Sequence, residues 1–461
     1  MADQLDHCSV WSIASKAEHP WEHAYGLPAG CAAAASWLSR IPGEDPLVLC
    51  TVPQPASVHL LLAALWTRRS LVLLSPHDPP ASHRARLQQL PIQPRHWLGS
   101  TPPQPNMQHH PLPPQWPAVD SIDCVEDGQH IAWIIFGSGS SGRHRAIALR
   151  QRPLLAAAHC QAQHLGLSPG MRWLCCLPLH HVGGCMAVLR SLLAGADLSL
   201  HSAFAAQQVI ASLHDCHGIS VVPTMAQRLL EHTPHWDHAP IILLGGAACS
   251  SALRQSLIAT GCIPLRCWGA TETAAMATCE RYTDDPGPSA CGPALPGYEL
   301  AIGSGQQLLV RGPGIADTAY QHGRTISLRD ALGWLHTGDA ADIDSTGILH
   351  LRGRLDQAFT SGGETVFSED IEQILFTHPD IGDCCVVAIP DPQWGQVAAA
   401  WITPRHTDTP LHIEHVESWC RRQLSPAQRP RHWHLTDTIP QLANGKNDRH
   451  AVRQFFTSNT V

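Results

Sequence analysis

The segment with the clearest capacity for chemistry is a loop rich in glycine and serine, residues 136–145 (FGSGSSGRHR), which follows an apolar run over 131–136. Glycines let backbone N–H groups approach an anion closely, and serine hydroxyls add further donors. Arg143 and Arg145 add positive charge. This composition suits a bound triphosphate, although a flexible surface turn has the same residues.

The spacing of Gly137 and Gly142 is that of a Walker phosphate loop, but the residues that should follow are absent. A Walker loop continues with Lys-Ser or Lys-Thr, which reach the phosphates and bind magnesium. Arg143 and His144 occupy these positions here. A P-loop NTPase, which would release phosphate, is therefore disfavoured.

A second candidate segment, residues 268–273 (WGATET), combines an aromatic ring, hydroxyls and a carboxylate. Glu272 beside phosphates would be a natural magnesium ligand. The alternative is structural, with Thr271 or Thr273 capping a helix. Asp339 follows a tight turn over 334–338, where it could accept hydrogen bonds from ribose hydroxyls or simply stabilise the turn.

The C-terminal part of the chain adds charged residues and glycines near a change in composition. Arg354 and Asp356 precede residues 361–364 (SGGE), a mixture typical of hinges. Lys446 lies in a turn over 444–446, where an isolated lysine is ordinarily a solvated charge.

The elements that must position these residues alternate between strand and helix from residue 130 onward, which predicts a parallel α/β sheet with right-handed crossovers. After about residue 290, short strands with Gly and Pro turns predict a small barrel or antiparallel subdomain. The last hundred residues predict a small α+β domain, and the proline-rich segment 100–118 predicts a loop or extended connector. The expected strands are 47–52, 70–74, 131–136, 173–177, 219–222, 241–244, 299–302, 307–311, 347–352, 384–389 and 398–402, and the expected helices are 58–69, 153–164, 207–214, 225–231, 251–260, 369–377 and 412–424.

Composition narrows the class of protein. The 461 residues are enough for two to four structural units, and 44% are hydrophobic. The net charge is −8 and no basic stripe stands out, so nucleic acid is not an expected partner. We find no signal-peptide pattern and no apolar run long enough to span a bilayer, and we expect a cytoplasmic protein. The 17 cysteines are irregularly spaced without a C-x-x-C pair, which predicts buried reduced thiols, and the 31 histidines show no zinc-binding spacing.

Taken in order, these motifs resemble the adenylate-forming superfamily of acyl-CoA synthetases, luciferases and peptide-synthetase adenylation domains. The resemblance runs from about residue 131 to 450. Within the superfamily, the short chain and four segments are most similar to the o-succinylbenzoate–CoA ligases of menaquinone biosynthesis. These segments are 177–184 (LPLHHVGG), 189–196 (LRSLLAGA), 222–230 (VPTMAQRLL) and 243–248 (LLGGAA).

The resemblance implies an α/β fold in two domains. The large N-terminal domain, 1–353, would consist of α/β subdomains plus a small β-barrel-like subdomain, and would hold the ATP and acyl sites. A hinge at 354–356 would connect it to a small mobile α+β domain, 357–461. The resemblance also implies that ATP, Mg²⁺, CoA and a small carboxylic acid are the partners; it leaves a homo-oligomer open.

The family's site residues carry over by motif. Those that would hold ATP are Ser138, Ser140, Ser141 and Gly142 at the phosphates, Trp268 along adenine, Thr271 at phosphate, and Asp339 and Arg354 at the ribose. Glu272 would bind magnesium, Arg145 and Lys446 would offset negative charge during adenylation, and His181 would border and gate the acyl pocket. Asp356 would be the hinge residue, and Gly362, Gly363 and Glu364 would enter the site for the thiol step.

Three positions depart from the family pattern. His144-Arg145-Ala146 replaces the usual Pro-Lys-Gly, and arginine keeps the charge with a different geometry. His180 replaces the usual aromatic residue beside the pocket histidine, and Gln357 replaces the usual second Asp after the hinge. None of these changes removes a group that is essential for the reaction. We expect them to affect the fit of the substrate and the rate.

The types of residue near the expected acyl pocket restrict which carboxylic acids could be the substrate. An amino acid would need a carboxylate for its ammonium group, and residues 177–196 contain none. Arg190 and Arg228 could instead meet a second carboxylate, although either could be a surface or structural charge. Gly184, Gly245, Gly246 and Ala270 would line the acyl pocket. Two alternatives stay open: another aryl or medium-chain acyl-CoA ligase, and a non-catalytic nucleotide-binding homologue.

Overall fold

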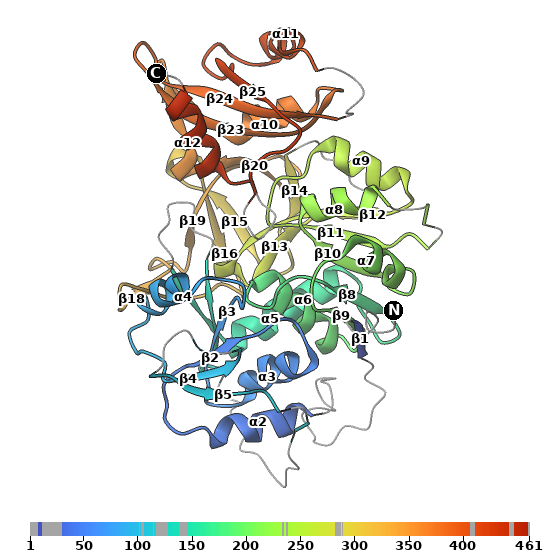
Figure 1. Ribbon diagram of the computed structural model, residues 1–461, viewed down its shortest axis with the longest axis vertical. Helices are drawn as coiled ribbons and strands as arrows, with labels where there is room; N and C mark the ends of the chain where they lie inside the picture. Colours follow the sequence, from blue (N-terminus) through green and yellow to red (C-terminus); the bar gives the residue numbers. More distant parts are fainter. Residues whose placement is uncertain are drawn as a thin grey trace.

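The computed structural model describes residues 8–11, 30–100, 102, 106–113, 115–116, 128–137, 145–232, 235–236, 238–281, 287, 289–405, 411–441 and 447–459. Figure 1 shows a large body that carries a smaller C-terminal domain at one end. No helix in these ranges is long and apolar enough to cross a membrane. The cysteines in these ranges are free thiols, most of them buried, as the sequence predicts.

The first layer is an eight-stranded mixed sheet in the order β18-β17-β7-β6-β3-β2-β4-β5. Strands β6, β3, β2, β4 and β5 run parallel, and β7, β17 and β18 are antiparallel to their neighbours. Its strands are β2 (Leu47–Cys50), β3 (Leu71–Leu74), β4 (His96–Gly99), β5 (Gln108–His110), β6 (Ile131–Phe136), β7 (Ala146–Arg150), β17 (Thr318–Gln321) and β18 (Arg324–Ser327), and its helices are α2 (Cys31–Arg40), α3 (Pro55–Trp66), α4 (Pro80–Leu87) and α5 (Gln151–His164).

A seven-stranded sheet forms the second layer, in the order β1-β9-β8-β10-β11-β12-β13. The five inner strands are parallel and the two edge strands are antiparallel. Its strands are β1 (Cys8–Trp11), β8 (Arg172–Cys175), β9 (Asp197–His201), β10 (Gly218–Val221), β11 (Ile241–Leu244), β12 (Ile263–Ala270) and β13 (Ala275–Cys279), and its helices are α6 (Val182–Leu193), α7 (Ala206–Leu213), α8 (Pro223–Leu230), α9 (Ser251–Ala259) and the 3₁₀ turn η1 (Thr271–Thr273).

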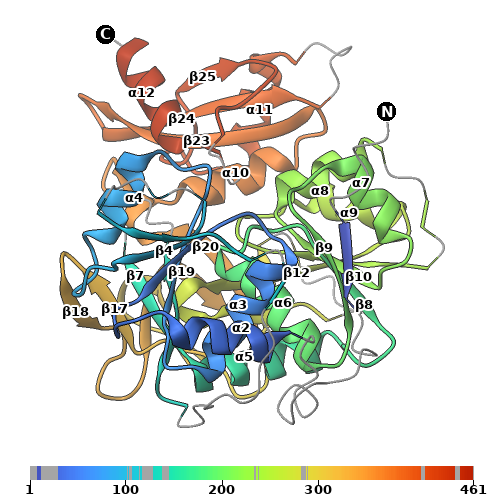
Figure 2. The same ribbon diagram turned by 60° about the horizontal axis from the view of Figure 1, so that its bottom comes forward.

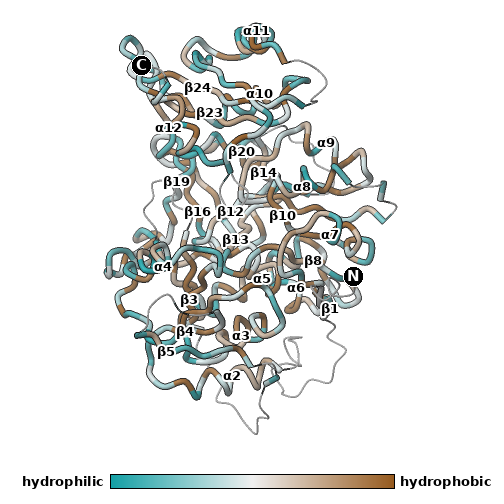
Figure 3. Tube along the Cα trace, viewed as in Figure 1, coloured by the Kyte–Doolittle hydropathy of each residue, from teal (hydrophilic) through white to brown (hydrophobic). Residues whose placement is uncertain are grey.

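Helices α3, α5 and α6 lie between the two sheets. Helix α6 contacts both α3 and α5, while α3 packs on β6, α5 on β7 and α6 on β8 and β9. Helix α3 is apolar around its whole circumference, as expected for a helix enclosed in a core. One continuous apolar core therefore spans both sheets, and Figure 3 shows strands such as β3 as strongly hydrophobic. Helices α7, α8 and α9 cover the outer face of the second sheet with a separate core.

The region after residue 290 forms the antiparallel sheet that the sequence predicts, in the order β14-β20-β19-β16-β15. Its elements are β14 (Ala290–Pro293), β15 (Glu299–Ile302), β16 (Gln307–Arg311), β19 (Leu335–Ile343), β20 (Ile348–Arg354) and the 3₁₀ turn η2 (Ser304–Gln306). The hairpin β17–β18 lies in the same stretch of sequence but joins the eight-stranded sheet through β7. The strand at 131–136 likewise belongs to that sheet and not to the one formed by β8–β12.

The C-terminal domain is the predicted α+β unit, built on a sheet in the order β22-β21-β24-β23 with β25 parallel to β24. Separate apolar cores lie on its two faces. Figures 1 and 2 show this domain, in orange and red, next to the α8–α9 region. Its elements are η3 (Leu355–Gln357), β21 (Phe359–Ser361), β22 (Glu364–Val366), β23 (Ile381–Asp391), β24 (Gly395–Pro404), β25 (His432–Leu435), α10 (Ser368–Phe376), α11 (Ile413–Gln423) and α12 (Arg449–Asn459).

The proline-rich segment 100–118 differs from its prediction as a plain connector. It contains β5, which pairs in parallel with β4 at the edge of the eight-stranded sheet. Prolines flank this strand on both sides without entering it. An edge strand needs hydrogen bonds on one side only, so a short non-proline stretch is sufficient.

A buried ion pair joins β12 to the end of β13. Arg266 Nε donates to Glu280 Oε1 at 2.9 Å, and the Arg266 backbone N–H donates to Glu280 Oε2 at 2.8 Å. Glu280 is fully buried, and Arg254 approaches it at 3.6 Å. Removing one member of such a pair leaves an uncompensated buried charge, which is strongly destabilising.

We therefore expect Glu280→Ala to lower the free energy of unfolding by about 3–5 kcal/mol, because Arg266 would stay buried without its anion. Urea unfolding followed by tryptophan fluorescence measures this loss. Glu299→Ala is the matched control, since Glu299 pairs with Arg311 on the exposed face of β15 and β16. Equal shifts in the two variants would contradict the role assigned to the buried pair.

Candidate active site

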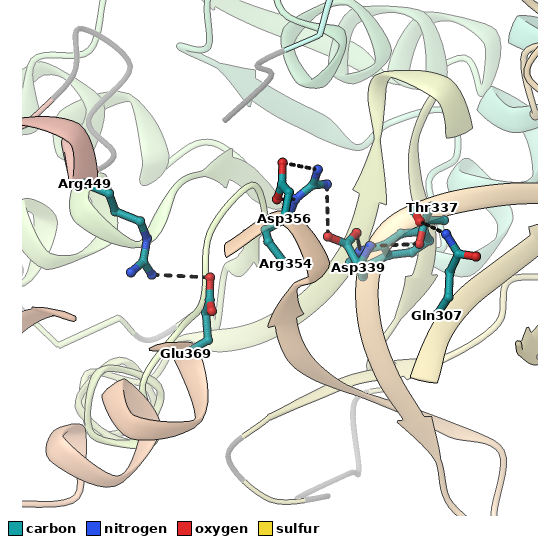
Figure 4. Close-up of polar contacts among 8 residues, drawn as sticks. Gln307, Thr337, Asp339, Arg354, Asp356, Glu369 and Arg449 are labelled. Carbon is teal, nitrogen blue, oxygen red and sulfur yellow. Dashed lines mark hydrogen bonds and ion pairs between the residues drawn. The ribbon is translucent and has the colours of Figure 1, made fainter. Parts of the chain in front are cut away.

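Three elements meet at the carboxylate of Asp339. Trp268, near the end of β12, donates its indole N–H to Asp339 Oδ2 at 2.9 Å. Arg354, at the end of β20, donates from Nη1 to Asp339 Oδ1 at 3.2 Å. Asp339 and Arg354 are also direct neighbours in the β19–β20 ladder. The seven-stranded and five-stranded sheets are thereby joined at one side chain (Figure 4).

The backbone below Asp339 is equally well anchored. Its N–H donates to the Thr337 hydroxyl at 3.2 Å, and that hydroxyl donates to the Leu308 carbonyl at 2.8 Å. Gln307 donates to the Thr337 carbonyl at 2.7 Å. Asp339 therefore keeps a defined position while its side chain stays partly exposed to the space above it.

The turn that carries Thr271 and Glu272 is tightly built. The buried Thr273 hydroxyl accepts from the Ala270 N–H at 2.8 Å and donates to the Ala275 carbonyl at 2.6 Å. Ala274 and Ala275 both have left-handed backbone conformations, with φ of 51° and 69°. Such residues cost of order 1 kcal/mol each, and they persist only where the surroundings fix them. A side chain at Gly269 would overlap the Ala275 carbonyl, so this position requires glycine.

Glu272 lies in a field of opposing charges. Burial raises the pKa of its carboxyl, the positive charges of Arg145 and Arg354 lower it, and Asp339 raises it. The side chains of Arg145, Glu272, Asp339 and Arg354 are therefore close enough to interact. A single protein carboxylate among cations fits magnesium bound mainly through substrate phosphates. No group of three or more metal-ligating side chains occurs within the described ranges.

The base of the glycine- and serine-rich loop is located beside this turn. Strands β6 and β7 pair in antiparallel up to Phe136 and Ala146, and the Gly137 N–H donates to the Arg145 carbonyl at 3.0 Å. Strand β7 contacts η1. The loop thus emerges next to Glu272. Ser138, Ser140, Ser141 and Gly142 lie outside the described residues.

Two of the acyl-side candidates, His181 and Gly184, lie where α6 begins, and the others lie at the ends of β11 and β12. His180 and His181 are half-buried neighbours with ring centroids 4.5 Å apart. A side chain at Gly184 would meet the Pro178 carbonyl at 2.4 Å, so glycine is required there. Gly245 lies against the Cys267 sulphur, Ala270 is half-buried, and Gly246 is exposed with a φ of 79°.

The two candidate arginines occupy very different places. Arg190 is 2% exposed, and its guanidinium donates to the Ser220 hydroxyl at 2.6 Å and lies over the Trp173 ring. Its Nη1 also reaches Gln161 Oε1 at 3.5 Å, while its Nε–H has no hydrogen-bond partner. Arg228 is exposed on α8 and is not brought to the other candidates.

The junction between the domains is held by charged groups. Arg354 donates to Asp356 at 3.2 Å, and Arg352 pairs with Asp370 at 3.0 Å. Within the C-terminal domain, Arg449 on α12 pairs with Glu369 at 3.4 Å and with Glu372 at 2.7 Å on α10. Figure 4 shows Arg449 directed at Glu369, and Arg354 between Asp339 and Asp356.

The remaining candidates in the C-terminal domain are the turn residues 362–364 and Lys446. Gly362 and Gly363 form the β21–β22 turn with φ of 58° and 91°, and Glu364 is exposed. Gly362 packs on the Trp394 ring. Lys446 lies outside the described residues, but the loop that carries it is closed at its base by the bridge between Gln441 and Asn447.

Sequence reasoning named Thr273 only as a candidate helix cap, and it missed Gln161, which also builds this site. Gln161 is fully buried, and its side-chain amide donates to the carbonyls of Ala274 and Met276 at 2.8 Å and 3.1 Å. A signal was present: Gln161 continues the apolar stripe of α5 formed by Leu154, Ala157 and Ala158. A polar residue in a buried helical stripe requires a hydrogen-bond partner.

The fold and this arrangement define a nucleotide-dependent enzyme, and the chain belongs to the AMP-binding enzyme family. The family's sequence pattern matches residues 31–318, and that of the AMP-binding enzyme C-terminal domain matches residues 370–446. The protein is an AMP-forming acid–CoA ligase.

Named relatives agree on this class and differ in their acids. The 2-succinylbenzoate–CoA ligase of Bacillus pumilus is 30% identical over 350 residues, covering 73% of this chain and 71% of the relative. The feruloyl-CoA synthase of a Streptomyces species is 28% identical over 349 residues, covering 71% and 70%.

The fold is shared with solved structures. The o-succinylbenzoate CoA synthetase of Bacillus subtilis, in complex with its acyl-adenylate intermediate, superimposes with a TM-score of 0.81 at 23% identity, covering 92% of each chain. That protein has also been solved with ATP and a magnesium ion.

The half-buried position of His180 gives a pH-dependent prediction. Burial, together with the neighbouring His181, Arg86 and His77, lowers its pKa to about 3. The unfolded chain binds a proton there below about pH 6.5, whereas the folded protein does not. Above pH 6.5 His180 therefore has no pH-dependent effect on the free energy of unfolding. As the pH falls from 6.5 toward 3, protonation of His180 in the unfolded chain lowers that free energy.

We therefore expect His180→Phe to remove about 1–2 kcal/mol of the stability loss between pH 7.5 and pH 5. Urea midpoints across this range measure the difference between the variant and the wild type. His232→Phe, at an exposed position after α8, is the control. Parallel pH profiles for the wild type and His180→Phe would refute the prediction.

Proposed function

We propose that the acid is 2-succinylbenzoate, converted to 2-succinylbenzoyl-CoA for menaquinone biosynthesis. The observation that carries this proposal is Arg190, a buried cation beside the acyl-side candidates. Among the described residues no carboxylate forms an ion pair with it. Burial lowers its pKa to about 10, so the guanidinium is still charged at neutral pH.

A buried charge without a counter-ion is costly unless a ligand supplies one. The unpaired Nε–H of Arg190 gives an additional donor for an anion. Arg190 also interacts with Cys267, which lies against Gly245 on the wall proposed for the acyl pocket. An acid with a second carboxylate, such as the succinyl group, would satisfy this charge with charge-assisted hydrogen bonds.

For the adenylation step, residues at the end of β12, in the middle of β19 and at the end of β20 would hold ATP. Asp339 and Arg354 would contact the ribose, Trp268 would border the adenine, and Thr271 would contact phosphate. Ser138, Ser140, Ser141 and Gly142 would surround the phosphates. Magnesium, held by Glu272 and the phosphates, would reduce the negative charge that repels an attacking carboxylate.

Attack of the acid carboxylate on the α-phosphate joins two anions, and cations must offset the charge that develops. Arg145, on the base of the loop, and Lys446, from the C-terminal domain, would supply them. His181, Gly184, Gly246 and Ala270 would shape the acyl pocket, in which Gly245 also lies. Pyrophosphate leaves, and the acyl-adenylate stays bound.

Thioester formation would need a different face of the C-terminal domain. Rotation of residues 357–461 about Asp356 would withdraw Lys446 and bring Gly362, Gly363 and Glu364 to the acyl-adenylate, so that the CoA thiol displaces AMP. The domain bounds 1–353, 354–356 and 357–461 are part of this proposal. The ion pairs of Arg354 and Arg352 would re-form at each rotation.

The direct test is pyrophosphate release from MgATP with a panel of 2-succinylbenzoate, benzoate, ferulate, a fatty acid and an amino acid, followed by AMP release on addition of CoA. We expect kcat/KM for 2-succinylbenzoate to exceed that for the other acids by at least about tenfold, since a satisfied buried charge is worth more than 1.4 kcal/mol. A preference for ferulate or a fatty acid would identify another acyl-CoA ligase.

The role of Arg190 is tested by Arg190→Gln. We expect KM for 2-succinylbenzoate to rise by about 30- to 100-fold, from the loss of a charged hydrogen-bond donor, with a much smaller effect on benzoate. Arg228→Gln, made in parallel, separates the two arginines that the sequence singles out. A larger effect from Arg228→Gln would place the second carboxylate at α8 instead.

A further inference from the structure

Gln161 connects two parts of the site that would otherwise be separate. It lies on α5, between the sheets, and is fully buried. Its side-chain amide donates to the carbonyls of Ala274 and Met276, which flank the left-handed Ala275. Its carbonyl oxygen accepts from Arg190 at 3.5 Å. One amide group therefore touches both the turn of Glu272 and the guanidinium proposed for the acid.

The chemistry of the amide makes this connection directional. Only a group with donors on one atom and an acceptor on the other can meet two carbonyls and a guanidinium at once. The Gln161 amide has both, and its orientation is set by these partners. A displacement of Arg190 toward a bound anion would act on the same amide that fixes Ala274 and Met276.

The turn itself needs such support. Ala274 and Ala275 have left-handed conformations that these residues rarely adopt, so their backbone must be held by neighbours. The Thr273 hydroxyl secures the inner side of the turn, and Gln161 secures the side facing α5. A second anchor from α5 is nearby, since His164 contacts the Glu280 carbonyl at 2.9 Å.

We propose that Gln161 is a positioning residue that couples recognition of the acid at Arg190 to the turn that carries Thr271 and Glu272. This inference rests on the proposed function, because it takes Arg190 as the contact for the acid and Glu272 as the magnesium ligand. In this arrangement, ATP with magnesium and an acid bearing a second carboxylate each favour the geometry that the other requires.

The test uses the full chain with Gln161→Leu, which has a similar volume and no polar group. Binding of MgATP without any acid is measured by calorimetry, and we expect about tenfold weaker binding because two buried carbonyls lose their donor. The magnesium concentration that gives half-maximal pyrophosphate release should rise in parallel. Gln163→Leu, at an exposed position two residues further along α5, is the matched control and should bind MgATP as the wild type does.

A double-mutant cycle tests the coupling. For 2-succinylbenzoate, we expect the loss of kcat/KM in Gln161→Leu with Arg190→Gln to be at least about fivefold smaller than the product of the single losses, since the residues act through one contact. For benzoate, which has no second carboxylate, the losses should multiply. Gln161→Glu, which keeps an acceptor for Arg190 but no donor for the turn, should weaken MgATP binding as Gln161→Leu does.

The possible failures are distinguishable. If Arg190→Gln leaves the preference for 2-succinylbenzoate unchanged, the acid assignment is wrong, whatever Gln161 does. If Gln161→Leu lowers only the unfolding midpoint, with MgATP binding and magnesium dependence as in the wild type, Gln161 is a structural residue and the proposal is overturned. Losses that multiply for both acids would likewise overturn the coupling.

Discussion

The carboxylate of Asp339 is the interaction on which the arrangement of the site depends. It accepts from the indole of Trp268 on one sheet and from Arg354 on another, and Arg354 in turn contacts Asp356 at the start of the C-terminal domain. Two sheets are thereby joined through the two carboxylate oxygens of Asp339, and Arg354 extends this contact to the domain junction. Because both donors are partly buried, their hydrogen bonds are stronger than they would be in water. The site consequently has a rigid wall formed by β12, β19 and β20.

The opposite wall is set by the backbone and not by ion pairs. Gly184 and Gly269 lie where any side chain would overlap a carbonyl, and Ala274 and Ala275 have left-handed conformations. At Gly184 the close neighbour is the Pro178 carbonyl just before α6, and at Gly269 it is the Ala275 carbonyl at the start of β13. The site therefore combines one wall fixed by charge with another fixed by packing, and the buried guanidinium of Arg190 lies behind the second wall.

Much of this could be predicted from the sequence, since strand and helix periodicity located most elements from 47 to 424. Pairing between distant segments could not be predicted: the β17–β18 hairpin, which the sequence analysis did not predict, pairs with β7, about 170 residues earlier in the chain. The motif residues Asp339 and Arg354 are hydrogen-bonded to each other, and Glu272 lies within electrostatic range of both. The contrast between Arg190 and Arg228 was invisible, because burial and the absence of a nearby carboxylate depend on neighbours remote in sequence. The buried stripe of α5 did offer a signal for Gln161, but its partners Ala274, Met276 and Arg190 are remote in sequence and could not be predicted.

Gly353 has a consequence for how these domains can be recombined. A side chain there would approach the Glu369 carboxylate to 2.3 Å, so the last residues of β20 and the start of α10 are sterically matched. Glu369 also contacts Arg449 at the beginning of α12. A chimera that carries a foreign C-terminal domain after residue 356 would place a new residue opposite Gly353. A bulkier or differently charged residue there would change how the two domains pack against each other. Modular exchange between such enzymes is therefore best cut outside the segment that contains both Gly353 and Glu369.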